Sequence, residues 1–390
     1  MTHLAGSSRL LRAMNESAAL SHLLDRGKLT RAELRDLTGL SKPTISEAVR
    51  RLTDAGLVIV VGHVSAGPGP NAEVYAANPG AAYGIALSVR DTLMTGSPAL
   101  TGAVCDVSGA VRARLEAPVD FRAADPVDAV GDIVDDLRKR SGMSADATGY
   151  VQIGVAGAYD PHTGTVHHVD VPGWNRPGLI GRIQERVGTR VGVDNDVNLA
   201  AIAERRRGAA TDAESFALLW FGEGLGLAID LNGTLLRGAR GGAGEIGYMP
   251  LFSAAGARNA DLQDLVGGRA VLDLGASHRV PGQTPAEVVN AAVAAGPDGK
   301  AFLAELAERI AVGLAAVVAV LDPPLVVLGG EVAQAGGPAL CEAVVGAMRA
   351  APALETAVAI TSVTDDAVLL GALDAALATV REGLLASLHG

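Results

Sequence analysis

The stretch LTRAELRDLTGLSKPTISEAVRRLTDAGLV, residues 29–58, decides the fold of the N-terminal part of the chain, because it predicts two short helices joined by a tight turn. Thr30 and Glu33 have the spacing of a capping box at the start of the first helix. Gly39 suits the left-handed residue that ends a helix. Gly56 marks the end of the second helix in the same way. This is the pattern of a helix-turn-helix.

The second of these helices has one apolar face and one polar face. Ser41 can cap it, and Pro43 lies in the first turn, where a missing N–H does no harm. Its apolar side chains recur at helical spacing and predict a buried stripe of Ile45, Val49 and Leu52. The outward residues, which we expect to contact DNA, are Ser41, Lys42, Thr44, Ser46, Glu47 and Arg50. A plain three-helix bundle, or a helix-turn-helix used for protein contacts, is the alternative interpretation.

Residues 57–79, LVIVVGHVSAGPGPNAEVYAANP, contain two strand-like runs on either side of a Gly/Pro-rich tip. This pattern predicts a hairpin, or wing. We therefore expect a winged helix-turn-helix DNA-binding domain over residues 1–78, with double-stranded operator DNA as its partner. The tip, Ser65 to Asn71, holds no Lys or Arg. Because one copy would make few phosphate contacts, binding as a dimer to two half-sites is implied.

The composition indicates a globular protein with more than one domain. The chain has 390 residues, of which 49% are apolar and 19% are charged. Residues 1–78 carry nine Lys/Arg and seven Asp/Glu, a balance of +2, whereas the remainder carries 23 and 36, a balance of −13. The longest apolar run, residues 310–321, is too short to span a membrane. Two cysteines, Cys105 and Cys341, favour a reducing cytoplasm and argue against a cysteine-based zinc site.

From residue 82 onward, strand-like and helix-like segments alternate, which predicts α/β layers. The stretch VGVDNDVNLA, residues 191–200, is a strand followed by a helix, with two polar side chains, Asn195 and Asp196, at the junction. From the residues alone, Asp196 is a catalytic base, a ligand acceptor or the N-cap of a helix that starts at Val197. Glu245 is a ligand contact or an ion-pair partner of a neighbouring Arg such as Arg240.

Four motifs in order carry a resemblance to a known family: IGVAGAYDPHTGTVHHVDVPGWN, VDNDVNLAAIAE, GEGLGLAIDLNGTLLRGARGGAGEIGYM and LDPPLVVLGGEVA. Over residues 82–390 the chain resembles the ROK family of repressors and sugar kinases. The preceding helix-turn-helix resembles that of the repressor branch. The fold implied is an α/β, two-lobed, actin-like (ribonuclease H-like) ATPase and sugar-kinase fold after a mostly α-helical winged head, with a sugar cleft near residue 195.

The resemblance also implies which residues bind a sugar. Asn195 and Asp196 match the Asn-Asp pair that contacts sugar hydroxyls, and Glu245 matches another sugar contact. Tyr248 stands where the family has a zinc-coordinating His, and the segment GARNADLQDLV, residues 256–266, lacks the family's cysteines. Within it, Gln263 best matches a sugar-contacting Glu, with Asp264 as the near alternative. We therefore expect no metal and no cofactor.

The two phosphate turns of the kinases are replaced in this chain. In the stretch ALSVRDT, Ala86 stands where the family has Asp, no glycine is present, and Asp91 is displaced. In the turn Gly222–Gly226, Glu223 replaces a Thr, and a carboxylate there would repel a nucleotide. Because phosphoryl transfer depends on positioning and charge stabilisation, we expect no phosphorylation and assign no catalytic residue.

The predicted function is a cytoplasmic transcriptional regulator, with repression favoured, that senses a small sugar effector and forms a homodimer or homotetramer without a membrane partner. Two alternatives remain open. One is an active ATP-dependent sugar kinase with a regulatory DNA-binding head. The other is a constitutive DNA-binding or scaffold protein whose sugar cleft is empty.

Overall fold

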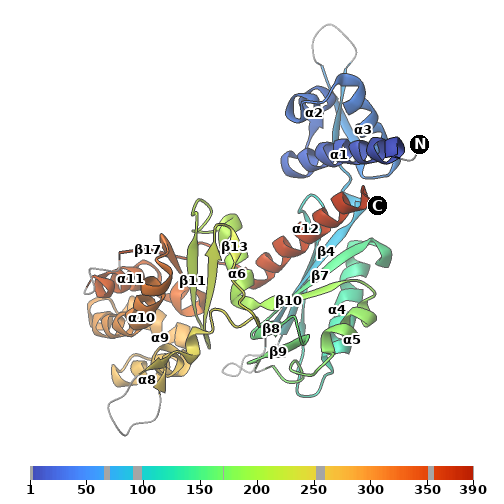
Figure 1. Cartoon of the computed structure of the whole chain (residues 1–390). Coiled ribbons are helices and arrows are strands. Elements are labelled where there is room, and N and C mark those ends of the chain that lie inside the picture. The colour runs from blue at the N-terminus through green and yellow to red at the C-terminus, as the bar shows by residue number, and fades with distance from the viewer. Residues whose placement is uncertain are drawn as a thin grey trace.

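The computed structural model describes residues 3–65, 71–90, 99–169, 171–251, 260–349 and 355–389. Residues 66–70 of the predicted wing tip, the displaced Asp91 and residues 256–259 of the segment without cysteines lie outside the described residues. Figure 1 shows a small N-terminal head joined to a larger body of two lobes. The helix α12, at the C-terminal end of the chain, reaches the head.

The head consists of three helices and a three-stranded sheet. Its elements are α1 (His3–Arg26), β1 (Leu29–Thr30), α2 (Arg31–Thr38), α3 (Lys42–Asp54), β2 (Val58–Val64) and β3 (Ala72–Ala77). Strand β3 pairs antiparallel with both β1 and β2. The predicted hairpin is therefore present as β2 and β3, and β1 ties it to the start of α2.

The local signals of the helix-turn-helix are confirmed. Both halves of the capping box between Thr30 and Glu33 are present, and Gly39 has a φ of 67° in the left-handed region. The Ser41 hydroxyl accepts a hydrogen bond from the Thr44 N–H at the start of α3. The predicted stripe is buried, with Ile45, Val49 and Leu52 each no more than 1% exposed.

The first lobe contains a five-stranded sheet in the order β10-β7-β4-β5-β6. Its elements are β4 (Tyr83–Arg90), β5 (Ala99–Asp106), β6 (Val111–Pro118), α4 (Pro126–Ser141), β7 (Thr148–Val155), α5 (Leu179–Val187) and β10 (Val191–Asn195). Strands β4, β7 and β10 are parallel, so their carboxyl ends lie at one edge of the sheet. Helices α4 and α5 pack on one face against Ile85, Leu87 and Val89.

The second lobe contains a sheet of the same plan, β13-β12-β11-β16-β17. Its strands are β11 (Phe216–Phe221), β12 (Leu225–Leu231), β13 (Thr234–Leu235), β16 (Leu325–Gly329) and β17 (Ala357–Ile360). Its helices are α7 (Leu262–Val266), α8 (Gly268–Ser277), α9 (Pro285–Ala294), α10 (Lys300–Leu321) and α11 (Gly330–Met348), the last kinked at Gly337. These helices cover the outer face and form the largest core cluster.

Two helices lie between the sheets, α6 (Asp196–Arg207) and α12 (Ala367–Ser387). Leu199 of α6 packs with α12 on the inner face of the first sheet. Val197 and Ala200, on another side of α6, pack against Phe216 and Leu218 of the second sheet. Helix α6 therefore contacts both lobes, and it begins at the predicted sugar-binding pair.

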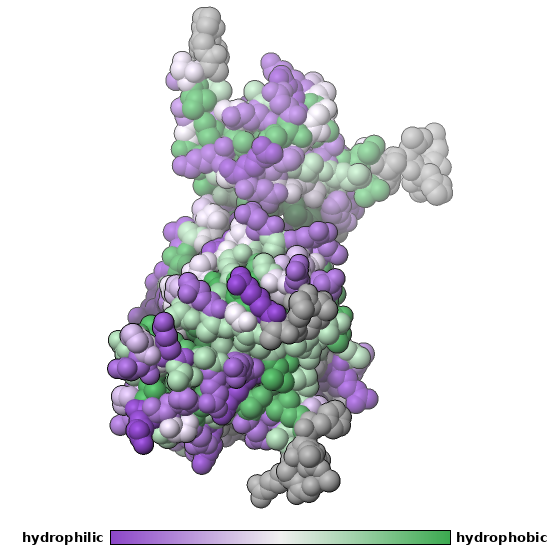
Figure 2. All heavy atoms as spheres, turned by 90° about the vertical axis from the view of Figure 1, so that its left-hand side faces the viewer, coloured by the Kyte–Doolittle hydropathy of each residue, from purple (hydrophilic) through white to green (hydrophobic). Residues whose placement is uncertain are grey.

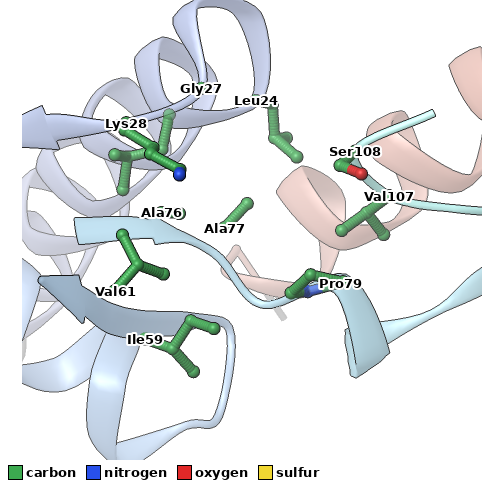
Figure 3. A pocket seen from close by; sticks show the side chains of 11 residues that line it. Leu24, Gly27, Lys28, Ile59, Val61, Ala76, Ala77, Pro79, Val107 and Ser108 are labelled. Carbon is green, nitrogen blue, oxygen red and sulfur yellow. The ribbon is translucent and has the colours of Figure 1, made fainter. Parts of the chain in front are cut away.

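The head and body meet at the carboxyl-terminal part of α12. Val380 and Leu384 of α12 share an apolar cluster with Leu23 of α1 and with Tyr75 of β3. A pocket of about 250 Å³ lies at this junction. Figure 3 shows its apolar lining from α1 and the wing strands, with Lys28 on the head side and Val107 and Ser108 on the body side.

The remaining elements are short. They are β8 (Ala158–Asp160), β9 (Thr165–His167), β14 (Pro250–Leu251), β15 (Ala260–Asp261), and the 3-10 turns η1 (Pro79–Ala81), η2 (Ala145–Ala147), η3 (Ile246–Tyr248) and η4 (Gly296–Gly299). Within the described ranges, no helix is both long and apolar enough to cross a membrane.

Candidate functional site

The junction between β10 and α6 holds the two side chains that the sequence singled out. Asn195, rather than Asp196, is the N-cap of α6: its Oδ1 accepts hydrogen bonds from the N–H groups of Val197 (2.8 Å) and Asn198 (3.3 Å). Its Nδ2 donates to the Gly157 carbonyl at 3.2 Å. The suggestion that Asp196 caps a helix starting at Val197 is therefore wrong by one residue, because the helix already begins at Asp196.

Asp196 is the most perturbed acid of this region. Burial, together with the negative charges of Glu331 and Glu245, raises its pKa to about 6, although a hydrogen bond from the Val197 N–H opposes the shift. We call Asp196, Glu245 and Glu331 the carboxylate cluster. Among the ion pairs that the described part of the chain makes, none includes a member of this cluster.

Glu245 lies in the loop that follows β13, directly before η3. The ion pair with Arg240, considered from the sequence, is not found among the described residues. Burial raises the pKa of Glu245, and the nearby His168 lowers it by a smaller amount. An unpaired, half-buried carboxylate costs free energy unless a hydrogen-bond donor reaches it, and sugar hydroxyls are such donors.

Tyr248 is 59% exposed, and its ring lies 5.1 Å from the His168 ring, centroid to centroid. His168 has a φ of 53°, in the left-handed region. The pairing places an aromatic surface beside Glu245. His168 was not singled out from the sequence, and only its place in the motif TVHHVD could have indicated it.

Gln263 lies on α7, where its amide contacts the turn between β11 and β12. Its Oε1 accepts from the Leu225 N–H at 3.0 Å, and its Nε2 donates to the Glu223 carbonyl at 3.4 Å. The side chain therefore fixes the shape of the Gly222–Gly226 turn. A sugar contact by Gln263 remains a prediction that would use the amide's remaining hydrogen-bonding capacity. Asp264 is exposed and closes a capping box with Asp261.

The Gly329–Gly330 turn requires glycine at position 330 for a structural reason. Gly330 has a φ of +86°, and a Cβ on it would collide with the Phe221 carbonyl oxygen of the neighbouring strand. The residue that follows, Glu331, places a carboxylate against the backbone of Gly222. Sequence analysis missed Glu331, although its place directly after the glycine pair was a usable signal.

On the first lobe, β4 ends at Arg90 where the kinases have a phosphate turn. The Arg90 guanidinium donates to the Thr101 hydroxyl at 2.9 Å and lies 3.5 Å from a Glu116 carboxylate oxygen. A bulky, engaged side chain occupies this strand end instead of the glycines that let a backbone approach phosphate.

Five of the six predicted DNA-binding residues lie on helix α3, and the sixth, Ser41, is its N-cap. Ser41 and Thr44 are joined through their hydroxyls at 2.8 Å, and Ser46 and Glu47 are half-buried. Arg50 pairs with Glu47 and Asp54, each at 2.7 Å. Hydrogen bonds from the arginines at positions 50 and 51 lower the pKa of Glu47 to about 2. Lys42 has no ion pair within the described ranges.

Two protein-family models match this chain, one over the body and one over the head. The model of the ROK family matches residues 92–379, and the model of the MarR family matches residues 11–67. The first match covers the body from the end of β4 to α12. The second covers the helix-turn-helix and reaches into the wing.

Individual relatives include both repressors and kinases. The xylose repressor of Caldicellulosiruptor bescii is 24% identical over 84% of this chain and 85% of its own length. The glucokinase of Halalkalibacterium halodurans is 28% identical over 52% of this chain and 68% of its own length. A crystal structure of a ROK family transcriptional regulator, homologous to the E. coli MLC protein, superposes with a TM-score of 0.74 at 19% identity, covering 97% of this chain and 99% of that one.

Proposed function

The chain belongs to the ROK family, and we propose that it is a DNA-binding transcriptional repressor of sugar-metabolism genes whose kinase-like body senses a sugar without phosphorylating it. The observation that carries the proposal is that α12 contacts both the helix of the proposed sugar site and the DNA-binding head. The match to a xylose repressor over 84% of this chain and 85% of the repressor supports the same assignment.

The proposed sugar site lies between the lobes, at the carboxyl ends of parallel strands, where α/β proteins commonly bind ligands. We propose that Asp196 and Glu245 accept hydrogen bonds from sugar hydroxyls, with Asn195, Tyr248 and Gln263 shaping the site. Amide and carboxylate groups suit a polyol, whose hydroxyls both donate and accept.

The absence of phosphorylation is proposed from the strand ends. Ala86 offers no carboxylate on β4, and Glu223 adds a negative charge to the second turn. Phosphoryl transfer needs positive groups and close backbone contacts around the phosphates. At the first strand end the one cation, Arg90, is engaged by Thr101 and Glu116, and residues 86–90 contain no glycine; at the second, the glycine-rich turn carries the Glu223 carboxylate.

The route from the sugar site to the head runs through two packed helices. A Cβ on Gly371 of α12 would collide with the Leu199 carbonyl of α6, so these helices are in close backbone contact. An ion pair between Arg207 and Asp374 joins them further along. A ligand that closes the lobes on α6 would therefore displace α12, and a coupling free energy of about 1–3 kcal/mol is enough for a useful switch.

We propose that the protein binds its operator as a dimer, because α3 of a single head has few Lys or Arg side chains free to contact DNA phosphates. Figure 2 views the body from its second lobe and shows apolar patches among hydrophilic surface. On α10, Val312 and Val320 are 45% and 81% exposed. Exposed apolar surface of this kind is suited to contact between subunits.

We propose that this DNA-binding protein acts in the cytoplasm.

The test is a gel-shift assay on the upstream region of the gene, with a panel of hexoses, pentoses and amino sugars. We expect sequence-specific binding by the wild type that one sugar weakens or strengthens. Asp196→Ala should lose the sugar response and keep operator binding, whereas Asp298→Ala, an exposed carboxylate on η4, should keep both. Sequence-independent binding, or none, refutes the repressor. A missing response to every sugar refutes the sensor and favours a constitutive DNA-binding protein.

A second candidate, an active sugar kinase with a DNA-binding head, has two observations in its favour. The glucokinase relative is one, and the raised pKa of Asp196, which suits a general base near neutral pH, is the other. Coupled ATP-turnover assays over the same sugars decide between the two. Turnover that Asp196→Asn abolishes would establish the kinase.

A further inference from the structure

The starting point is the place of Glu331. This residue follows β16 and the Gly329–Gly330 turn, and a Cβ on Gly222 would collide with its Oε2 atom. The same Cβ position lies 3.4 Å from Nε1 of Trp220. The Glu331 carboxylate therefore lies against Gly222, the first residue of the Gly222–Gly226 turn, near Trp220 at the end of β11.

Glu331 is one of two carboxylates whose charge acts on Asp196. The negative charges of Glu331 and Glu245 both disfavour the ionised form of Asp196 and so help to raise its pKa. Glu331 comes from the second lobe and Asp196 from the start of α6, so the cluster spans the region between the lobes. Two carboxylates that share a site disfavour each other's ionised form.

The positive groups around the cluster are largely engaged elsewhere. Arg90, the cation that acts on Glu331, is held by Thr101 and Glu116 on the first lobe. Arg237, on the loop after β13, makes two hydrogen bonds to Asp194 at 2.7 and 2.9 Å. Within the described residues, the three acids therefore outnumber the two side chains, Arg90 and His168, that favour their ionised forms.

The consequence for a ligand follows from charge. A sugar phosphate carries up to two negative charges near neutral pH, and like charges at short range cost free energy in a partly desolvated site. A free sugar presents only hydroxyls, which donate to carboxylates without that cost. We infer, resting on the proposed sugar site, that the effector is an unphosphorylated sugar and that Glu331 is the residue that excludes phosphate groups.

The first test does not depend on knowing the sugar. Binding of inorganic pyrophosphate and of a non-hydrolysable ATP analogue is measured by calorimetry and by tryptophan fluorescence, since Trp220 adjoins the turn. The proteins are the full-length wild type, Glu331→Gln and the matched control Glu342→Gln, an exposed acid on the same helix. Thermal unfolding verifies that each is folded.

We expect both anions to bind Glu331→Gln about tenfold more tightly than the wild type, which corresponds to about 1.4 kcal/mol. Glu342→Gln should behave as the wild type. Equal binding by the wild type and Glu331→Gln would overturn the inference.

The second test uses matched sugar pairs in the gel-shift assay, each sugar free and as its phosphate ester. The free form should change operator binding by the wild type and the ester should not, while Glu331→Gln should respond to both. A stronger wild-type response to the ester overturns the inference. If no sugar in either form has an effect, the proposed sensor fails, and the anion measurement still decides the role of Glu331.

Discussion

The charges of the head and those of the region between the lobes are arranged in opposite ways. On α3 the charged side chains other than Lys42 form ion pairs near the surface, as Arg50 does with both Glu47 and Asp54. Between the lobes, Asp196 and Glu245 are partly buried and have no ion pair among the described residues. Surface pairs contribute little to stability and exchange easily, whereas buried unpaired acids are costly. The difference indicates a head that exchanges its pairs for DNA phosphate and a body that keeps acids for a ligand.

The largest expected effect tests whether the unpaired acids between the lobes destabilise the fold. Asp196→Asn should raise the free energy of unfolding at about pH 7.5 by about 1–3 kcal/mol, because it removes the ionised form. The folded pKa of about 6 lies above the ordinary 3.8. Ionisation therefore destabilises the fold as the pH rises from about 4 through 6, and the gain should vanish near pH 4. Urea denaturation at both pH values measures it. A variant less stable than the wild type at pH 7.5 contradicts an unpaired acid.

The next effect separates the two neighbours at the start of α6. Asn195→Ala should lower the free energy of unfolding by about 1 kcal/mol, because the helix loses its N-cap. Asn195→Asp keeps an acceptor for the same N–H groups, so it should recover most of the cap and serves as the control. Chemical denaturation of the three proteins gives the values. Equal stability of Asn195→Ala and the wild type would show that the cap is dispensable.

A smaller effect concerns the link between the two regions. Arg207→Ala removes the ion pair to Asp374 on α12 and should cost about 0.5–1 kcal/mol of stability. It should also reduce the change in operator affinity that the effector produces, while operator affinity without effector stays within about twofold. Titrations of labelled operator with and without sugar check both. An unchanged sugar response would place the coupling elsewhere.

The smallest effect tests the exchangeable charges of the head. Glu47→Gln frees Arg50 and Arg51 from one partner, so operator affinity should rise a few-fold, with a steeper dependence on salt. Lys42→Ala should lower affinity and make that dependence shallower. Fluorescence anisotropy at several salt concentrations gives both slopes. Weaker binding by Glu47→Gln would assign the carboxylate a direct contact with a base.

The sequence predicts those features that depend on neighbours in the chain. The Thr30–Glu33 capping box and the Ser41 cap span three residues each, so spacing alone identifies them. At Asn195 and Asp196, either residue has the chemistry of an N-cap, so the sequence does not distinguish a helix that starts at Val197 from the observed one that starts at Asp196. The role proposed for Glu331 could not be predicted from the sequence, because it depends on a tertiary contact with Gly222, about a hundred positions earlier. The contact of Gln263 with the turn is likewise tertiary.

The position of α12 has a consequence for how the protein is made on the ribosome. This last helix covers the inner face of the first sheet and also carries Val380 and Leu384, which pack against the head. During synthesis the head and the first sheet emerge early, yet neither obtains this partner until residues 367–387 have left the exit tunnel. A chain that stops short of α12 retains α3 but lacks the apolar contacts of Val380 and Leu384 with the head. Emergence of α12 from the ribosome is therefore the step at which these contacts with the head can form.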